Sequence, residues 1–206
     1  MDVITKLTEE FAKFPGIGPR QARRFVYYLL QKNGNALEIL ANDIRRLKQE
    51  VRLCPSCFRH FIPRNQEAKE CDICQDQARK GDSLMVVEKE ADFETIERSG
   101  VHEGKYFILG GSVVLLDKEP GQYIRTKELL KTIEERAKDG LKEVVLALST
   151  NVEGEETSAY LREALSPLQK KHSFSISELG RGLSTGAELE YSDKETIKNA
   201  FQNRRA

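Results

Sequence analysis

All four cysteines of this chain occur in two short pairs whose spacing suits a metal ion. Each pair has the pattern Cys-X-X-Cys, and residues 58–70 separate the two pairs. Two intervening residues let both thiolates of a pair face one ion, and two pairs complete the tetrahedral sulfur set that zinc accepts. Four thiolates leave no open position for water, so the ion would be structural. The pattern predicts one zinc ion per chain, held by Cys54, Cys57, Cys71 and Cys74.

Disulfide bonds and unrelated free thiols are the alternatives for these cysteines. Disulfides fit poorly with the start of the chain, where acidic residues stand in place of the basic and apolar stretches of an export signal. Unrelated free thiols are a poor explanation, because all four cysteines of the chain fall in this spacing. His60 lies between the pairs and competes as a ligand, although a solvated loop histidine is the simpler interpretation. We expect residues 54–80 to form a small module without much core.

A glycine turn followed by arginines is the second group suited to chemistry, in this case phosphate binding. Proline and glycine end one predicted helix within 15–19, and arginines open the next. The N–H groups of such a turn and of the following helix N-terminus favour an anion. Arg20 and Arg24 share a helix face. Arg23 lies one position back from Arg24 and is the least needed of the three for phosphate contact. An ordinary turn between helices is the alternative. The pattern predicts DNA contact, without sequence readout, at Arg20, Arg24, Arg23, Gly16 and Gly18.

Composition and charge limit the other function classes. The 206 residues carry 33 basic and 33 acidic side chains, which argues against one large surface of a single sign. Residues 1–80 hold 15 Lys and Arg against 10 Asp and Glu, and residues 81–206 hold 18 against 23. This asymmetry agrees with an anion-binding first part, and random surface variation explains it equally well. The longest nearly uncharged run, 106–116, is too short to cross a bilayer. We expect a cytoplasmic protein that does not enter membranes.

The periodicity of apolar residues predicts the elements that position these groups. Helical spacing occurs over 4–14, around 22–30 and over 36–53. Later in the chain, the predicted strands are 83–88, 106–109, 143–148 and 174–179, and the predicted helices are 91–99, 126–139, 157–165 and 194–203. Strands that alternate with helices favour a parallel sheet covered by helices. The predicted fold class is α/β with a helical N-terminus.

The order of these parts resembles the RecR family of bacterial recombination mediators. The resemblance covers nearly the whole chain, and its specific carriers are the two cysteine pairs with the stretches Phe14–Arg20, Val86–Glu88, Leu109–Gly111, Asn151–Thr157 and Leu189–Asp193. It departs from the family pattern at Ser112–Pro120, Ser184 and Ala187. The resemblance implies a helix-hairpin-helix domain at 1–53, a zinc finger at 54–80, a Toprim domain at 81–175, and a short C-terminal interaction and oligomerisation region at 176–206.

The resemblance also implies a function. Family members are non-enzymatic DNA-binding clamps that form dimers and tetrameric rings. They act with RecO and RecF in recombinational DNA repair, and help to load recombinase onto single-stranded DNA. The region of Glu153 and Glu155 resembles a docking surface for RecO. Zinc is the one cofactor that we expect.

The Toprim resemblance raises the question of catalysis. Catalytic relatives hold magnesium with a glutamate after the first strand and an aspartate pair after a later one. Glu88 occupies the first place, but the residues after 143–148 are Ser149, Thr150 and Asn151, which bind magnesium weakly. We therefore expect no catalytic residues.

Two other functions remain as alternatives. One is a metal-dependent Toprim nuclease or primase-like enzyme that uses Glu88 with Glu153 and Glu155, and the missing aspartate pair argues against it. The other is a zinc-stabilised interaction module that binds no nucleic acid, and the hairpin with its arginines argues against that.

Overall fold

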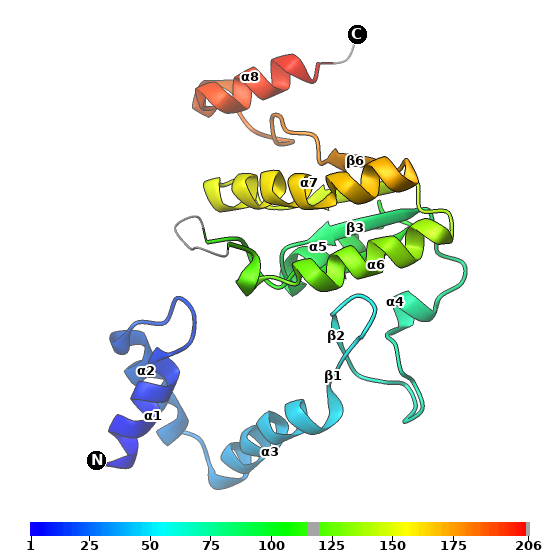
Figure 1. The fold of residues 1–206 in the computed structure, drawn as a ribbon. Coiled ribbons are helices and arrows are strands. Elements are labelled where there is room, and N and C mark those ends of the chain that lie inside the picture. Colours follow the sequence, from blue (N-terminus) through cyan, green and yellow to red (C-terminus); the bar gives the residue numbers. More distant parts are fainter. Residues whose placement is uncertain (115–119, 205–206) are drawn as a thin grey trace. The chain divides into compact units, whose positions relative to one another are not determined.

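The chain forms two compact units, Met1–Arg52 and Leu53–Ala206. The computed structural model describes residues 1–114 and 120–204 (Figure 1). Within these ranges, no helix combines the length and the apolar character needed to span a bilayer. The departure from the family pattern at Ser112–Pro120 falls partly on residues 115–119, which lie outside the described residues.

The N-terminal unit consists of three helices, α1 (Val3–Ala12), α2 (Pro19–Leu30) and α3 (Gly34–Glu50). The Asp2 side chain begins α1 by accepting hydrogen bonds from the backbone N–H groups of the first turn, which have no partner within the helix. Helices α1 and α2 pack through a small core in which Ala22 and Val26 are buried. Phe11 adds an edge-on contact with Phe25, with ring centroids 5.9 Å apart. Helix α3 buries none of its residues.

The second unit is built on a parallel sheet of four strands in the order β4-β3-β5-β6. These strands are β3 (Ser83–Val87), β4 (Lys105–Ile108), β5 (Glu143–Ala147) and β6 (Ser175–Glu178), and the helices between them are α5 (Glu90–Ser99), α6 (Thr126–Lys138) and α7 (Val152–His172). The smaller elements are β1 (Arg52–Leu53), β2 (His60–Phe61), α4 (Asp72–Gln75), the 3₁₀ turns Pro120–Tyr123 and Leu189–Tyr191, and α8 (Lys194–Gln202). On the central strand, Val86 lies between Phe107 of β4 and Leu146 of β5.

Successive side chains of each strand point to opposite faces of the sheet, and both faces are buried. Leu84, Val86 and Phe107 face a core closed by α6 and α7, whose residues Leu129 and Leu161 are fully buried. The opposite face carries Met85, Val87, Tyr106 and Ile108. It is covered by Phe93 of α5 and by three of the cysteines with their neighbours, Cys54, Cys57, Cys71, Phe61 and Ile73. The cysteine segment is therefore part of the core of the sheet unit.

The predicted α/β class with a helical N-terminus and a parallel sheet is confirmed. The expectation that residues 54–80 lack much core was wrong, because these residues share the core of the sheet. The helix predicted at 157–165 is much longer, since α7 begins at Val152. The Asn151 side chain caps it by accepting a hydrogen bond from the Gly154 N–H over 2.9 Å. A Cβ on Gly154 would lie 1.9 Å from the Ser149 carbonyl oxygen, so this close approach requires glycine.

Candidate metal centre and nucleic-acid interface

The structure brings the four cysteine sulfurs together. All lie within 4.8 Å of one another, and the Sγ atoms of Cys57 and Cys71 are 3.6 Å apart. Cys54, Cys57 and Cys71 are buried, Cys74 is half-buried, and all four are free thiols. Within the described residues they form the one group of three or more Cys, His, Asp or Glu side chains gathered closely enough to hold an ion. Such a set of four sulfurs suits a tetrahedral thiolate-bound metal.

Two tight turns place these sulfurs. The first pair lies between β1 and β2, where the Cys54 N–H donates to the Arg59 carbonyl over 2.8 Å and the Phe58 N–H donates to the Cys54 carbonyl over 2.9 Å. Phe58 has a φ of 61°, an uncommon conformation for a residue with a side chain. The second pair lies at α4, where the Cys71 N–H points at the Cys54 sulfur over 3.4 Å. This last contact joins the two turns.

The four thiols shift one another's pKa values because they lie so close together. Hydrogen bonds from Cys57, Cys71 and Cys74 lower the pKa of Cys54, and the contact with Cys54 raises the pKa of Cys57. Neighbouring sulfurs do not all ionise without a compensating positive charge, because like charges repel. Cys54, Cys57, Cys71 and Cys74 would hold a divalent ion, which would supply that charge.

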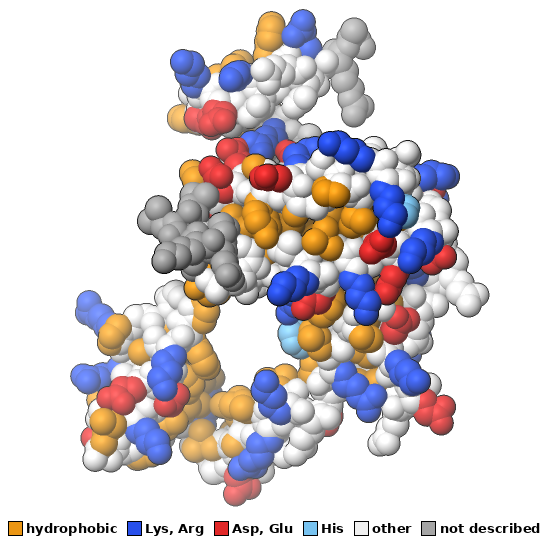
Figure 2. All heavy atoms as spheres, viewed as in Figure 1, with side chains coloured by type: hydrophobic (Ala, Val, Ile, Leu, Met, Phe, Trp, Pro, Cys, Tyr) orange, Lys and Arg blue, Asp and Glu red, His pale blue; other side chains and the backbone are white. Residues whose placement is uncertain are grey.

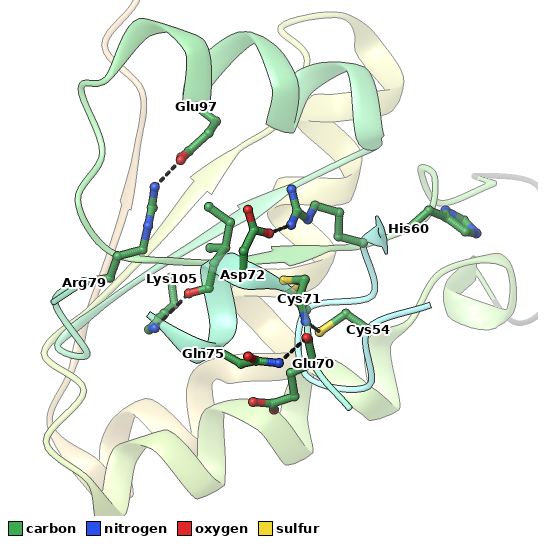
Figure 3. A network of polar contacts seen from close by, with 12 residues as sticks. Cys54, His60, Glu70, Cys71, Asp72, Gln75, Arg79, Glu97 and Lys105 are labelled. Atoms are coloured by element: carbon green, nitrogen blue, oxygen red, sulfur yellow. Dashed lines mark hydrogen bonds and ion pairs between the residues drawn. The ribbon is translucent and has the colours of Figure 1, made fainter. Parts of the chain in front are cut away.

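His60 is not part of this centre. Its Nδ1 atom lies 2.6 Å from Glu90 Oε1, and Figure 3 shows the ring directed away from the labelled cysteines. The competing hypothesis of a histidine ligand is therefore not supported.

Two basic residues near the cysteines were not identified from the sequence. Lys105, at the start of β4, is 7% exposed and donates to carbonyl oxygens of the segment that contains Cys74 (Figure 3). Arg59 forms an ion pair with Asp72 and lies over the Phe93 ring, with Cζ 5.0 Å from the centroid. Burial disfavours the charge of Arg59, but the Cys71 thiol and Asp72 outweigh it and raise the pKa of Arg59. No sequence signal marks either residue, because their partners are distant in the chain or are backbone atoms.

The residues of the glycine turn are exposed together at the start of α2. Gly16 has a φ of 75°, and the Ile17 N–H closes the turn by donating to the Phe14 carbonyl over 3.0 Å. Gly18 is the N-cap of α2 and Pro19 its first residue, so the free N–H groups of the helix start lie beside the turn. Of the sequence-predicted residues, Gly16 thus lies in the turn and Gly18 caps the helix that follows it.

The arginine side chains of α2 point away from the small helical core. Arg20, Arg23 and Arg24 are all exposed, and none of them forms an ion pair within the part of the chain that the structure describes. Arg24 Nη1 makes one long contact of 3.4 Å with Gln21 Oε1. Figure 2 shows Lys and Arg side chains and hydrophobic side chains exposed side by side on this unit. Unpaired arginines beside a helix N-terminus are suited to phosphate contacts.

The acid in the first Toprim position has a neutral partner. Glu88 is 9% exposed, and Ser149 Oγ donates a hydrogen bond of 2.8 Å to its carboxylate. Lys89 Nζ is 3.8 Å from the other oxygen. Asn151 is occupied as the cap of α7. The residues after β5 therefore add no carboxylate to Glu88.

The two acids assigned to partner binding lie in the first turn of α7. Glu153 and Glu155 are both exposed, and Glu155 forms an ion pair with Arg181, which follows β6. Their carboxylates do not join Glu88 in a compact metal-binding group among the described residues.

Comparison with known proteins gives the class of this architecture. The Toprim domain model matches residues 82–179, and the model described as RecR, helix-hairpin-helix matches residues 4–48. The model described as RecR, C-terminal matches residues 182–205. The chain is thus a Toprim-domain protein with an N-terminal helix-hairpin-helix.

Curated relatives make the assignment more specific. The chain is 35% identical to the recombination protein RecR of Syntrophobacter fumaroxidans over 204 residues, which cover 99% of this chain and 96% of the relative. It is 37% identical to the RecR of Roseiflexus castenholzii over 202 residues, covering 98% and 93%. The chain belongs to the RecR family of recombination proteins.

Proposed function

We propose that this protein is a non-enzymatic DNA-binding mediator of recombinational repair. It works with RecO and RecF as a ring-forming homo-oligomer, helps to load recombinase onto single-stranded DNA, and acts in the cytoplasm, where the chromosome lies. The observation that carries the proposal is the exposed pair Arg20 and Arg24 beside the Gly16–Gly18 turn. These groups contact phosphates, which carry no base identity, so binding is independent of sequence.

The first test changes Arg20 and Arg24 together to Ala and measures binding to gapped DNA over a range of salt concentrations. We expect weaker binding, and a salt slope that flattens by about one unit for each phosphate that a bound subunit no longer neutralises. The matched control changes Arg45 and Lys48 of α3, which are also exposed, to Ala. The proposal would be contradicted if the double mutant bound gapped DNA as tightly as the parent at equal salt and oligomeric state. The alternative of a zinc-stabilised interaction module that binds no nucleic acid would then be favoured.

An uncovered apolar face supports assembly from several copies. In α3, side chains that would normally be buried are 37–60% exposed: Leu37, Ile39, Leu40, Ile44 and Leu47. One hairpin with a few arginines binds weakly, and several copies on one ring raise the affinity through effective concentration. We expect Leu40→Glu with Ile44→Glu to reduce the mass measured by light scattering. Asn35→Glu with Asn42→Glu, which adds the same charge to α3, should leave the mass unchanged.

The exposed acids at the start of α7 are the proposed contact for RecO. Glu153 has no ion pair among the described residues, whereas Glu155 is held by Arg181. Binding of purified RecO should weaken in Glu153→Lys with Glu155→Lys, and DNA binding should persist. Retention of RecO by this variant would place the contact elsewhere.

Zinc is the metal that we propose for the four cysteines, with one ion per chain. The support is the set of four sulfurs, which fits the ion and leaves no position for a reacting water. Cys54, Cys57, Cys71 and Cys74 would hold it, and its contribution would be to stabilise the fold. Metal analysis of freshly purified protein should find one zinc per chain.

The neutral residues after β5 support the absence of catalysis. A Toprim nuclease needs carboxylates around its magnesium, and here Glu88 is bonded to Ser149. We expect no DNA cleavage with magnesium or manganese. Cleavage that disappears in Glu88→Gln would favour the Toprim enzyme instead.

A further inference from the structure

Lys105 occupies an unusual position for a lysine. It is 7% exposed, and its ammonium group donates to the carbonyl oxygens of Ile73, Cys74 and Asp76 over 2.9, 3.1 and 2.6 Å. An ammonium group has three N–H donors, so all three are used. The acceptors belong to α4 and the residue that follows it, the segment that contains the last metal-binding cysteine.

In the described part of the chain, the charge of Lys105 has no carboxylate partner. None of the ion pairs within residues 1–114 and 120–204 includes it. A buried charge is costly unless an opposite charge or a full set of hydrogen bonds compensates it. The carbonyl groups supply the hydrogen bonds. The nearby cysteine cluster supplies negative charge once it holds a divalent ion, because four thiolates then leave a net charge of about −2.

Arg59 is a second cation beside the same cluster. Its Nε atom is buried and has no hydrogen-bond partner among the described residues, while its terminal nitrogen pairs with Asp72. The Asp72 side chain is 50% exposed and the Arg59 side chain 16%, so the carboxylate lies on the solvent side of the pair. Arg59 belongs to the turn of the first cysteine pair, because its carbonyl oxygen accepts a hydrogen bond from the Cys54 N–H over 2.8 Å. An ionised sulfur accepts hydrogen bonds, and the Nε N–H of Arg59 is a donor available for one.

We propose that Lys105 and Arg59 are positioning residues of the metal centre. Lys105 fixes the backbone that presents Cys74 and places a positive charge near the loaded cluster, and Arg59 fixes the turn of the first cysteine pair while its ion pair with Asp72 ties this turn to α4. The inference rests on the zinc site proposed above. Retention of the ion then depends on Lys105 and Arg59, which are not ligands, and Lys105 belongs to strand β4 of the sheet.

The experiment measures the transfer of zinc from full-length, metal-loaded protein to a chromogenic chelator, well below the melting temperature. Lys105→Met removes the charge and the donors but keeps the length of the side chain. We expect it to release zinc about tenfold faster or more, because residues that support metal ligands typically change affinity by about 10- to 100-fold. The control is Lys80→Met, which removes an exposed lysine paired with Glu103 in the same region. It should change the rate less than about twofold.

A second pair of variants tests the arginine. Arg59→Gln should also accelerate zinc release, whereas Arg64→Gln, at an exposed arginine of the same segment, should not. The absorption spectrum of the cobalt-substituted protein adds a readout of tetrahedral thiolate geometry, which a change in overall stability does not alter. We expect this spectrum to change in Lys105→Met and in Arg59→Gln and to stay constant in both controls.

The outcomes separate the two proposals. Zinc in the wild-type protein with unchanged release from Lys105→Met and Arg59→Gln would overturn the positioning roles and leave the metal site intact. Wild-type protein without zinc would overturn both. If Lys105→Met is insoluble, Lys105→Gln is measured against the same tenfold criterion.

Discussion

The glycine turn and the cysteine segment are both short motifs that can be recognised from residue spacing, yet they differ in how deeply the structure buries their key residues. The turn exposes its arginines and buries little, since Ala22 and Val26 provide most of the core beneath it. The cysteine segment buries three of its four key residues in a core shared with the sheet. From this difference we expect that the first motif tolerates substitution without loss of the fold, whereas the second does not.

The largest effect is expected where the motif and the core coincide. Cys57→Ser removes a proposed metal ligand that is 1% exposed, and structural zinc contributes roughly 10–16 kcal/mol of apparent binding energy in small modules. We expect residues 54–80 to become disordered or the protein to become insoluble, as judged by amide exchange and recovery of soluble protein. A Cys57→Ser protein that folds normally and keeps its zinc would show that the two motifs do not differ as described.

The same leucine substitution in each unit sharpens the comparison. Leu161 of α7 is fully buried and Leu30 of α2 is 61% exposed. Leu161→Ala should lower the free energy of unfolding by about 2–5 kcal/mol, because it removes buried apolar surface and leaves a cavity. Leu30→Ala should change it by less than about 0.5 kcal/mol. Urea unfolding measures both values, and equal losses would contradict the proposed contrast between the units.

The smallest effect concerns an acid at the end of the sheet. The hydrogen bond from Ser158 and the neighbouring Arg162 hold the pKa of Glu178 below its ordinary value of 4.5. A depressed pKa contributes stability above the unfolded value, and this contribution is lost as the pH falls through the folded value. Glu178→Gln should therefore cost less than about 1 kcal/mol at neutral pH and reduce the loss of stability in mild acid. Unfolding curves of the wild type and of Glu178→Gln, at neutral pH and in mild acid, test this. The same loss of stability in acid for both proteins would argue against it.

The sequence was sufficient for the parts of the structure that depend on local pattern. The spacing of Cys54, Cys57, Cys71 and Cys74 predicted a cluster that the structure forms, and the alternation of strands and helices predicted the parallel sheet. The start of α7 was missed because Gly154 weakens the helical pattern, and the need for that glycine lies in its close approach to Ser149. The tertiary placement of the cysteine segment was missed as well, since no periodicity marks which core a loop joins.

Lys105 shows the limit of sequence reasoning most clearly. A lysine at the start of a strand is ordinarily an exposed residue. Its acceptors are backbone carbonyl oxygens 29 to 32 residues earlier in the chain, and every residue type has such a group. Only the folded structure could therefore reveal these contacts.

The position of the cysteine segment on β4 has a consequence for chains that have not yet received metal. β4 is an edge strand of the sheet, and the backbone N–H of Ile108 is satisfied by the Cys57 carbonyl over 2.8 Å. An uncovered edge strand can pair with the same edge of another molecule and start aggregation. If the segment detaches when the ion is absent, β4 is uncovered together with the apolar side chains beneath it. Loss of the proposed ion would then open an edge strand to pairing with a second chain.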